Sequence, residues 1–148
     1  MISILILPMS LRESLAAEAL RAYPRECCGL IEGAARDDAI EALALHPARN
    51  LAKGYDRFEI DPADQFRLMR ALRGSRRAIV GCYHSHPGGV AEPSAHDRTG
   101  AGEENFIWLI AGLRPGDAPS LAAFVFSAGE FRPMRLVPSL DRQARGPL

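Results

Sequence analysis

The chain has 148 residues, 47% of them hydrophobic and 24% charged, which suits one compact, soluble domain and excludes a largely disordered chain. Eighteen basic and eighteen acidic residues cancel, so neither nucleic acid nor an anionic membrane surface is expected as a partner. No stretch approaches the ~20 apolar residues that span a bilayer. We expect a single domain over residues 1–140 and a disordered tail over 141–148.

The cysteines favour a reducing, cytoplasmic setting. Cys27, Cys28 and Cys82 are an odd number, and two of them are sequence neighbours, which would make a strained disulfide. We expect them to be buried small hydrophobic residues. The apolar start, residues 1–7, lacks a basic leader and a small-residue cleavage site, and therefore predicts a first strand.

A helix is predicted after this strand. Ser10 and Glu13 have the spacing of a capping box, which would start the helix at Ser10. Pro24 cannot continue a helix, so the end is expected near Tyr23. Apolar residues recur on one face, which should pack on a sheet: Leu11, Leu15, Ala19 and Ala22.

The middle of the chain predicts a hairpin, a loop and a second helix. Residues 27–31 and 39–45 are short strand-like runs on either side of a polar turn. Pro47 cannot donate to a ladder, so His46 and Pro47 should end the second run. Residues 48–59 are polar and irregular, which predicts a long surface loop. Asp61 and Pro62 open a helix that should run to Gly74.

A buried strand is expected over residues 78–83, with the segment His84-Ser85-His86-Pro87 at its end and a short helix from Ser94. Further strands are predicted over residues 106–111, 121–126 and 131–137. Early helices followed by mostly strands predict an α/β fold of the layered α+β kind, in which helices flank a mixed sheet.

Three residues near this segment form a candidate metal site. His84 and His86 are two apart on an extended segment, so both side chains project to the same side. Asp97 falls on the first turn of the short helix and offers a carboxylate. Three protein ligands with a fourth position open for water are typical of a catalytic zinc site, which implies one Zn²⁺ per chain.

Two further residues complete a hydrolytic centre. Zinc lowers the pKa of bound water from ~15.7 to about 7, which yields a nucleophile near neutral pH. Glu26 is the carboxylate that we expect to take the proton and deliver it to the leaving amine. The hydroxyl of Ser94 is expected to stabilise the negative charge on the scissile carbonyl oxygen.

Each residue alone has a simpler explanation: incidental strand polarity for the histidines, a helix cap for Ser94 and Asp97, and a solvated carboxylate for Glu26. The combination is far more specific. A glutamate, then His-Ser-His-Pro, six residues, a serine, two residues and an aspartate resembles the JAMM signature of the MPN+ zinc metalloproteases. Residues 24–33 look like the family's N-terminal glutamate motif, and residues 50–62 are also similar to short prokaryotic members.

This resemblance implies a cytidine-deaminase-like fold and hydrolysis of amide or isopeptide bonds. It assigns His84, His86 and Asp97 as ligands, Glu26 as the acid and base, and Ser94 to the oxyanion side. The chain lacks the insertions of larger relatives. It therefore resembles forms that act on the C-terminal tail of a ubiquitin-like or sulfur-carrier protein, including those that release cysteine from a carrier adduct.

Two other functions are kept as alternatives: a module that binds ubiquitin-like tails without cleaving them, and a RadC-like protein associated with DNA repair. The complete ligand set argues against the first, and the absence of a helix-hairpin-helix region argues against the second. The oligomeric state is open, a homodimer included. Three residues receive no role in the site: we expect His96 and His46 to face solvent and Trp108 to lie in the core.

Overall fold

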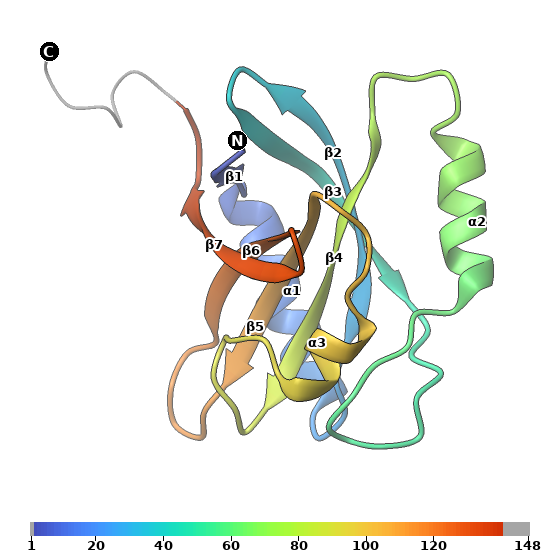
Figure 1. Ribbon diagram of the computed structural model, residues 1–148. Helices are drawn as coiled ribbons and strands as arrows, with labels where there is room; N and C mark the ends of the chain where they lie inside the picture. Colours follow the sequence, from blue (N-terminus) through green and yellow to red (C-terminus); the bar gives the residue numbers. More distant parts are fainter. Residues whose placement is uncertain (1, 141–148) are drawn as a thin grey trace, which may run out of the picture.

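The computed structural model describes residues 2–140, in which seven strands form one mixed sheet that closes into a barrel (Figure 1). The strands are β1 (Ile4–Ile6), β2 (Cys28–Arg36), β3 (Ala39–Ala48), β4 (Ala78–Pro87), β5 (Phe106–Leu113), β6 (Ser120–Ser127) and β7 (Glu130–Val137). The helices are α1 (Met9–Ala22), α2 (Pro62–Ala71) and α3 (Ala95–Gly100). The predicted mixed sheet with flanking helices is confirmed, whereas the predicted tail, 141–148, lies outside the described residues.

Strand pairing places β4 inside the sheet. The strand order is β1-β3-β2-β4-β5-β6-β7, and β1 closes the barrel because it pairs in parallel with both β3 and β7. The predicted hairpin of β2 and β3 is confirmed. β4 runs antiparallel to β2 and parallel to β5, so the segment His84-Ser85-His86 is paired with β5 along its whole length and with β2 at His84. Its backbone is therefore fixed.

The two faces of the sheet bury different clusters. On one face, Leu15 and Ala19 of α1 pack in the main core with Tyr83 and Leu109. On the other face, Cys82 packs with Trp108 and aromatic side chains of the neighbouring strands. Because side chains alternate along a strand, His84 and His86 leave β4 on the Cys82 side, away from α1.

The predicted start of α1 is wrong. The helix begins at Met9, and its N-cap is Pro8, without a side-chain hydrogen bond. The amide of Leu7 still bonds to the carbonyl of Val137 at 2.8 Å, so the chain leaves the barrel and turns directly at Pro8. The carbonyl of Pro8 accepts from the amides of Leu11 and Arg12, which places Ser10 inside the first turn, where it cannot cap.

The predicted end of β3 is also wrong, since the strand continues through His46 and Pro47 to Ala48. β1 pairs with β3 only opposite residues 39–41. Pro47 therefore pairs with Gly29 of β2 while no strand covers its other edge, and proline is tolerated at such an edge.

The start of α2 is confirmed: the side chain of Asp61 caps the helix by accepting the amide of Ala63 at 3.0 Å, and Pro62 follows as the first helical residue. The helix ends at Ala71. Leu68 is its buried residue, whereas Phe66 and Met69 are more than half exposed. Among residues 2–140, no helix is long and apolar enough to cross a membrane.

Gly29 provides a test of this packing. An added Cβ would overlap with the ring end of Tyr83 and with the backbone oxygen of His46. We expect Gly29→Ala to lower the free energy of unfolding by about 1–3 kcal/mol, the usual cost of overpacking a well-packed core. Urea unfolding measures the change. Gly102→Ala is the control, because its Cβ meets no atom within 4 Å; equal stability of the two variants would contradict the packing described.

Candidate metal centre

Two histidines of β4 direct their ring nitrogens to the same point. Nε2 of His84 lies 2.9 Å from Nε2 of His86. The side chain of His84 is fully buried, and that of His86 is 11% exposed. The pair therefore lies at the surface end of a buried strand, with access from the His86 side.

The third group comes from α3. Ser94 is the N-cap of this helix: its Oγ accepts the amide of Asp97 at 3.1 Å, and its own amide donates to Oδ2 of Asp97 at 2.8 Å. The predicted short helix and its capping box are confirmed. The same Oδ2 lies 3.1 Å from Nε2 of His84 and from Nε2 of His86.

The chemistry and spacing of these three atoms fit a zinc ion. Zinc prefers imidazole nitrogen and carboxylate oxygen, and tetrahedral bonds of ~2.0–2.1 Å place ligand atoms roughly 3.4 Å apart. The observed separations of 2.9–3.1 Å need only a small expansion. The structure thus brings together the three residues that the sequence singled out as ligands.

The two rings are held in different ways. Nδ1 of His86 lies 2.9 Å from the carbonyl oxygen of Val90, which can only accept, so this nitrogen carries the proton and Nε2 keeps its lone pair. Nδ1 of His84 is buried without a partner within the described chain. Its ring is instead packed by Phe58, which stacks at 4.3 Å and 22°, and by Trp108, which lies edge-on at 5.9 Å.

Glu26 lies beside the histidines, just before β2. It is only 4% exposed, and its carboxylate and the ring nitrogens of His84 and His86 all lie within 4.8 Å of one another. Its Oε1 is buried, with no hydrogen-bond partner among residues 2–140. Burial raises the pKa of Glu26 to about 7. A carboxyl group with this pKa can both take up and release a proton near neutral pH.

Burial and hydrogen bonding set the charges of the other groups. Burial lowers the pKa of His84, so its ring is neutral, as metal binding requires. Burial would raise the pKa of Asp97, but the hydrogen bonds to His84 and His86 outweigh it and hold that pKa well below its usual range. For His86, burial lowers the pKa, and the bonds to Asp97 and Val90 outweigh it. A proton that competes with a metal therefore binds at His86.

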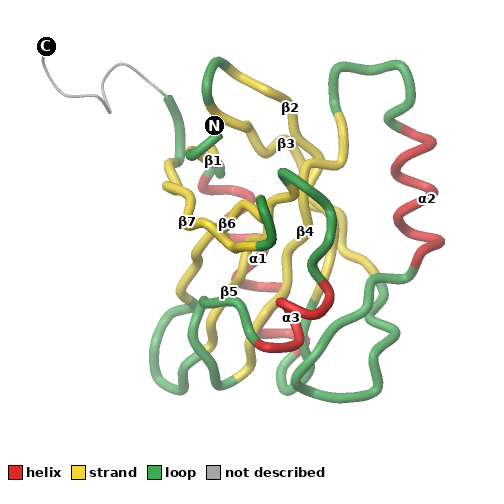
Figure 2. Tube along the Cα trace, viewed as in Figure 1, coloured by secondary structure: helices red, strands yellow, loops and turns green. Residues whose placement is uncertain are grey.

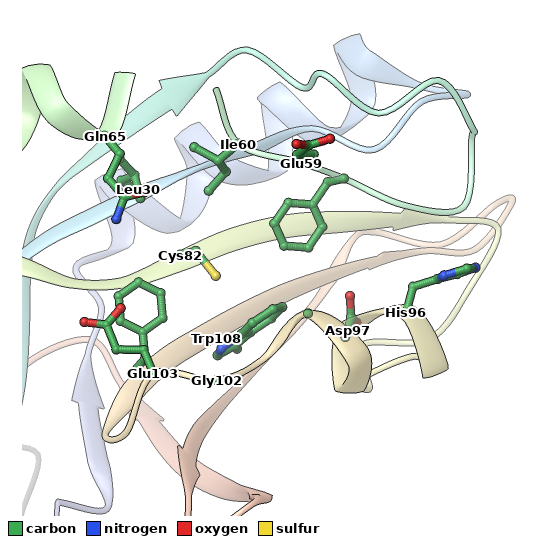
Figure 3. Close-up of a pocket in the computed structure, with 13 residues that line it drawn as sticks. Leu30, Glu59, Ile60, Gln65, Cys82, His96, Asp97, Gly102, Glu103 and Trp108 are labelled. Atoms are coloured by element: carbon green, nitrogen blue, oxygen red, sulfur yellow. The ribbon is translucent and has the colours of Figure 1, made fainter. Parts of the chain in front are cut away.

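The connection between β3 and α2, residues 49–61, runs close to α3 and lines two cavities at the centre (Figure 2). An open cleft of about 510 Å³ is lined by Glu26, His86 and Ser94. A second, mostly apolar pocket of about 340 Å³ is lined by Asp97 and Trp108, among others, and Figure 3 shows Asp97 on the short helix at one end and Trp108 in the middle. The open cleft therefore connects Glu26 and His86 with the protein surface.

Three residues at the centre were missed by the sequence analysis. Phe58 and Asn50 belong to the segment predicted as a surface loop, yet Phe58 stacks on His84, and Nδ2 of Asn50 donates to the carbonyl of Glu26 at 3.1 Å. Ser85 is fully buried, and its Oγ accepts the amide of Cys27 at 2.8 Å. Only Ser85 had a usable signal, its place between the two histidines.

The residues left without a role mostly lie as expected. His96 is 47% exposed at the side chain and contacts Asp56 at 3.3 Å, outside the centre. Trp108 is a core aromatic. His46 is only partly exposed, because its ring bonds to the buried Glu32 at 3.0 Å. The cysteines are buried and free, as predicted: Cys27, Cys28 and Cys82.

A family model of prokaryotic homologs of the JAB domain matches residues 8–127. This chain belongs to that family. The match runs from the turn before α1 through β6, and includes Glu26 and the whole of the centre. The resemblance drawn from the His-Ser-His-Pro segment is thereby confirmed.

Known relatives of this JAB protein include two with names that denote function. It is 35% identical over 88 residues to a desampylase of Haloferax volcanii, a match that covers 59% of this chain and 62% of the relative. It is 27% identical over 111 residues to a CysO-cysteine peptidase of Mycobacterium tuberculosis, covering 75% of each. The chain thus spans less than two thirds of the desampylase.

Solved structures place the JAB protein in the JAB/MPN fold, as predicted. A solution structure of a Desulfitobacterium hafniense protein superposes with a TM-score of 0.79 at 27% identity, covering 90% of this chain and 91% of the other. A JAB1/MPN domain protein from Archaeoglobus fulgidus superposes with a TM-score of 0.53 at 20% identity, covering 91% of this chain and 98% of the other.

The raised pKa of Glu26 predicts a pH-dependent cost in stability. When an acidic group has a higher pKa in the folded than in the unfolded state, the protein loses stability as the pH rises from the unfolded to the folded pKa. For Glu26 this loss continues up to about pH 7, and the stability is not regained above it. In zinc-free protein at pH 8, Glu26→Gln should therefore be more stable than the wild type by roughly 1–3 kcal/mol.

Urea unfolding with a chelator, from pH 4.5 to 8, measures this difference, which should shrink toward pH 4.5. Glu130→Gln, at an exposed position on β7, is the control and should follow the wild type at every pH. A difference between Glu26→Gln and the wild type that stays constant with pH would contradict the assigned cause.

Proposed function

We propose that this protein is a zinc-dependent metallopeptidase of the JAMM isopeptidase type. Its substrate would be a ubiquitin-like or sulfur-carrier protein conjugate, in which it hydrolyses an amide bond at the carrier's C-terminus. One observation carries the proposal: the nitrogens of His84 and His86 and the oxygen of Asp97 lie 2.9–3.1 Å apart, beside a buried Glu26 carboxylate whose Oε1 has no partner among residues 2–140. A purely structural role would favour pairing that carboxylate.

In this proposal, His84, His86 and Asp97 hold the zinc. They supply three protein ligands, which leaves a position for water, as in catalytic sites. The closeness of Glu26 makes it a competing ligand, but Oδ2 of Asp97 lies 3.1 Å from both nitrogens, whereas the group with Glu26 extends to 4.8 Å. We therefore assign Glu26 to proton transfer.

When bound, zinc acts as a Lewis acid and lowers the pKa of water enough to provide a nucleophile near pH 7. Glu26 would accept a proton from the water that adds to the scissile carbonyl carbon. Ser94 bonds to the carbonyl oxygen as negative charge develops, since its Oγ accepts from Asp97 and keeps its own proton to donate. Glu26 then gives the proton to the leaving nitrogen, and the C–N bond breaks to a carboxylate and an amine.

The cleft that contains Glu26, His86 and Ser94 is open and holds about 510 Å³, enough for an extended C-terminal tail. Similarity to a desampylase and to a CysO-cysteine peptidase supports a carrier-protein conjugate as the substrate. Release of cysteine from a carrier adduct is the narrower form of the same reaction. The buried, free cysteines support a cytoplasmic site of action.

Metal content tests the ligand assignment. Elemental mass spectrometry should find about one zinc per wild-type chain and none in the His84→Ala/His86→Ala double variant, because two of three ligands are lost. His46→Gln is a matched control, since this histidine bonds to Glu32 outside the centre. Zinc missing from the wild type after reconstitution would favour the module that binds tails without cleaving them.

Glu26→Gln separates chemistry from metal binding. The variant should keep its zinc and lose about 10²–10⁴-fold in kcat, the usual contribution of general acid–base catalysis. Turnover is measured on two carriers that end in Gly-Gly, one ubiquitin-like and one a sulfur carrier, each joined through its terminal glycine to 7-amino-4-methylcoumarin or to cysteine. Full activity in Glu26→Gln would rule out the mechanism, and Glu130→Gln should behave as wild type.

Ser94→Ala tests the oxyanion role. Loss of a preorganised donor should lower kcat by about 10²-fold with zinc retained, while loss of the helix cap should cost only ~1 kcal/mol of stability. Both quantities are measured, with kinetics well below the melting temperature. A lower melting temperature with unchanged kcat would mean that Ser94 only caps α3.

A further inference from the structure

The carboxylate of Glu26 lies beside the proposed metal ligands. Its Oε1 has no hydrogen-bond partner in the described chain, and its proposed role requires a fixed distance to the reacting water. Glu26 also precedes β2, so its backbone does not take part in the hydrogen bonds of the sheet. Its position therefore depends on how the backbone at residues 26 and 27 is held.

Ser85 holds that backbone from the strand that carries the ligands. The amide of Ser85 donates to the carbonyl of Cys27 at 3.1 Å, and the amide of Cys27 donates to Oγ of Ser85 at 2.8 Å. In a regular antiparallel pair the second bond goes to a backbone carbonyl. Here the Ser85 hydroxyl takes that place, so a side chain located between His84 and His86 secures the residue that follows Glu26.

A second contact acts on the other side of the same peptide. Nδ2 of Asn50 donates to the carbonyl of Glu26 at 3.1 Å and to the carbonyl of Arg57 at 3.3 Å. Its Oδ1 accepts the amides of Ala52 and Glu59. Asn50 ties Glu26 to the loop, whereas Ser85 ties the next residue, Cys27, to the strand of the histidine ligands.

We propose that Ser85 is a positioning residue that fixes the Glu26 carboxylate relative to His84 and His86, an inference that rests on the proposed function. Ser85 is fully buried, which leaves its side chain no access to substrate. Within residues 2–140, the hydrogen bonds of the three ligand side chains do not involve the Ser85 hydroxyl: they connect His84, His86, Asp97, Val90 and Ser94. Its loss should therefore affect proton transfer and leave metal binding intact.

Kinetics of Ser85→Ala test this role, with the carrier-coumarin amide as substrate. We expect kcat to fall about 10–100-fold, since a misplacement of ~1 Å can cost 10²-fold, with KM changed less than threefold. Ser85→Thr keeps the hydroxyl and should restore at least a third of wild-type kcat. Ser127→Ala is the matched control, because Ser127 is a serine of β6 whose hydroxyl donates to Glu104, away from the centre. This variant should have the kcat of the wild type.

The double variant Ser85→Ala/Glu26→Gln distinguishes positioning from general damage. If Ser85 acts through Glu26, its loss should lower the residual kcat of Glu26→Gln by less than twofold. An additional 10-fold loss in that background would overturn the proposal. So would a wild-type kcat in Ser85→Ala, or a change in zinc affinity of more than tenfold.

A measurement without substrate keeps the test independent of the proposed function. Amide hydrogen exchange at Cys27, followed by NMR in the zinc-loaded protein, should accelerate at least tenfold in Ser85→Ala and stay near wild type in Ser85→Thr. Unchanged exchange in Ser85→Ala would refute the positioning role of Ser85 even if the wild type is active. Faster exchange in Ser85→Ala, together with a wild type that cleaves neither carrier, would support the positioning role of Ser85 and reject the proposed substrate instead.

Discussion

Oδ2 of Asp97 is the atom at which the separate parts of the centre meet. It accepts from the amide of Ser94, and it lies equally far, 3.1 Å, from the Nε2 atoms of His84 and His86. The first bond belongs to the start of a short helix, and the other two contacts belong to a strand within the sheet. A local helix cap thus helps to fix the distance between α3 and β4, and its N-cap residue, Ser94, lines the open cleft beside Glu26.

The centre is stabilised by its surroundings more than by its own contacts. Two of its buried polar atoms, Oε1 of Glu26 and Nδ1 of His84, have no partner in residues 2–140. Each such group costs about 1–3 kcal/mol. The sheet offsets this because its α1 face buries a continuous apolar core and its other face packs Trp108 against the ring of His84. Unsatisfied groups of this kind persist at sites where function depends on them.

The sequence predicted the local features well because they depend on spacing. The two-residue period of a strand placed His84 and His86 together, and the capping box at Ser94 predicted α3. It failed where the decisive contact was distant in the chain: the bond of Leu7 to β7 moved the start of α1, and the unpaired edge of β3 accommodated Pro47. The role of Phe58 depends on how the whole connection of residues 49–61 folds back, which no local pattern contains.

That connection has a consequence for how relatives with other specificities can arise. Asn50 fastens one end of it to the backbone of Glu26, and Phe58 presses the other end against a histidine ring. The residues between them, from Lys53 to Asp56, include Tyr55 and Asp56 at the open cleft. Evolution can therefore lengthen or exchange this short stretch to change what the cleft binds, while the two contacts on either side keep Glu26 and His84 in place.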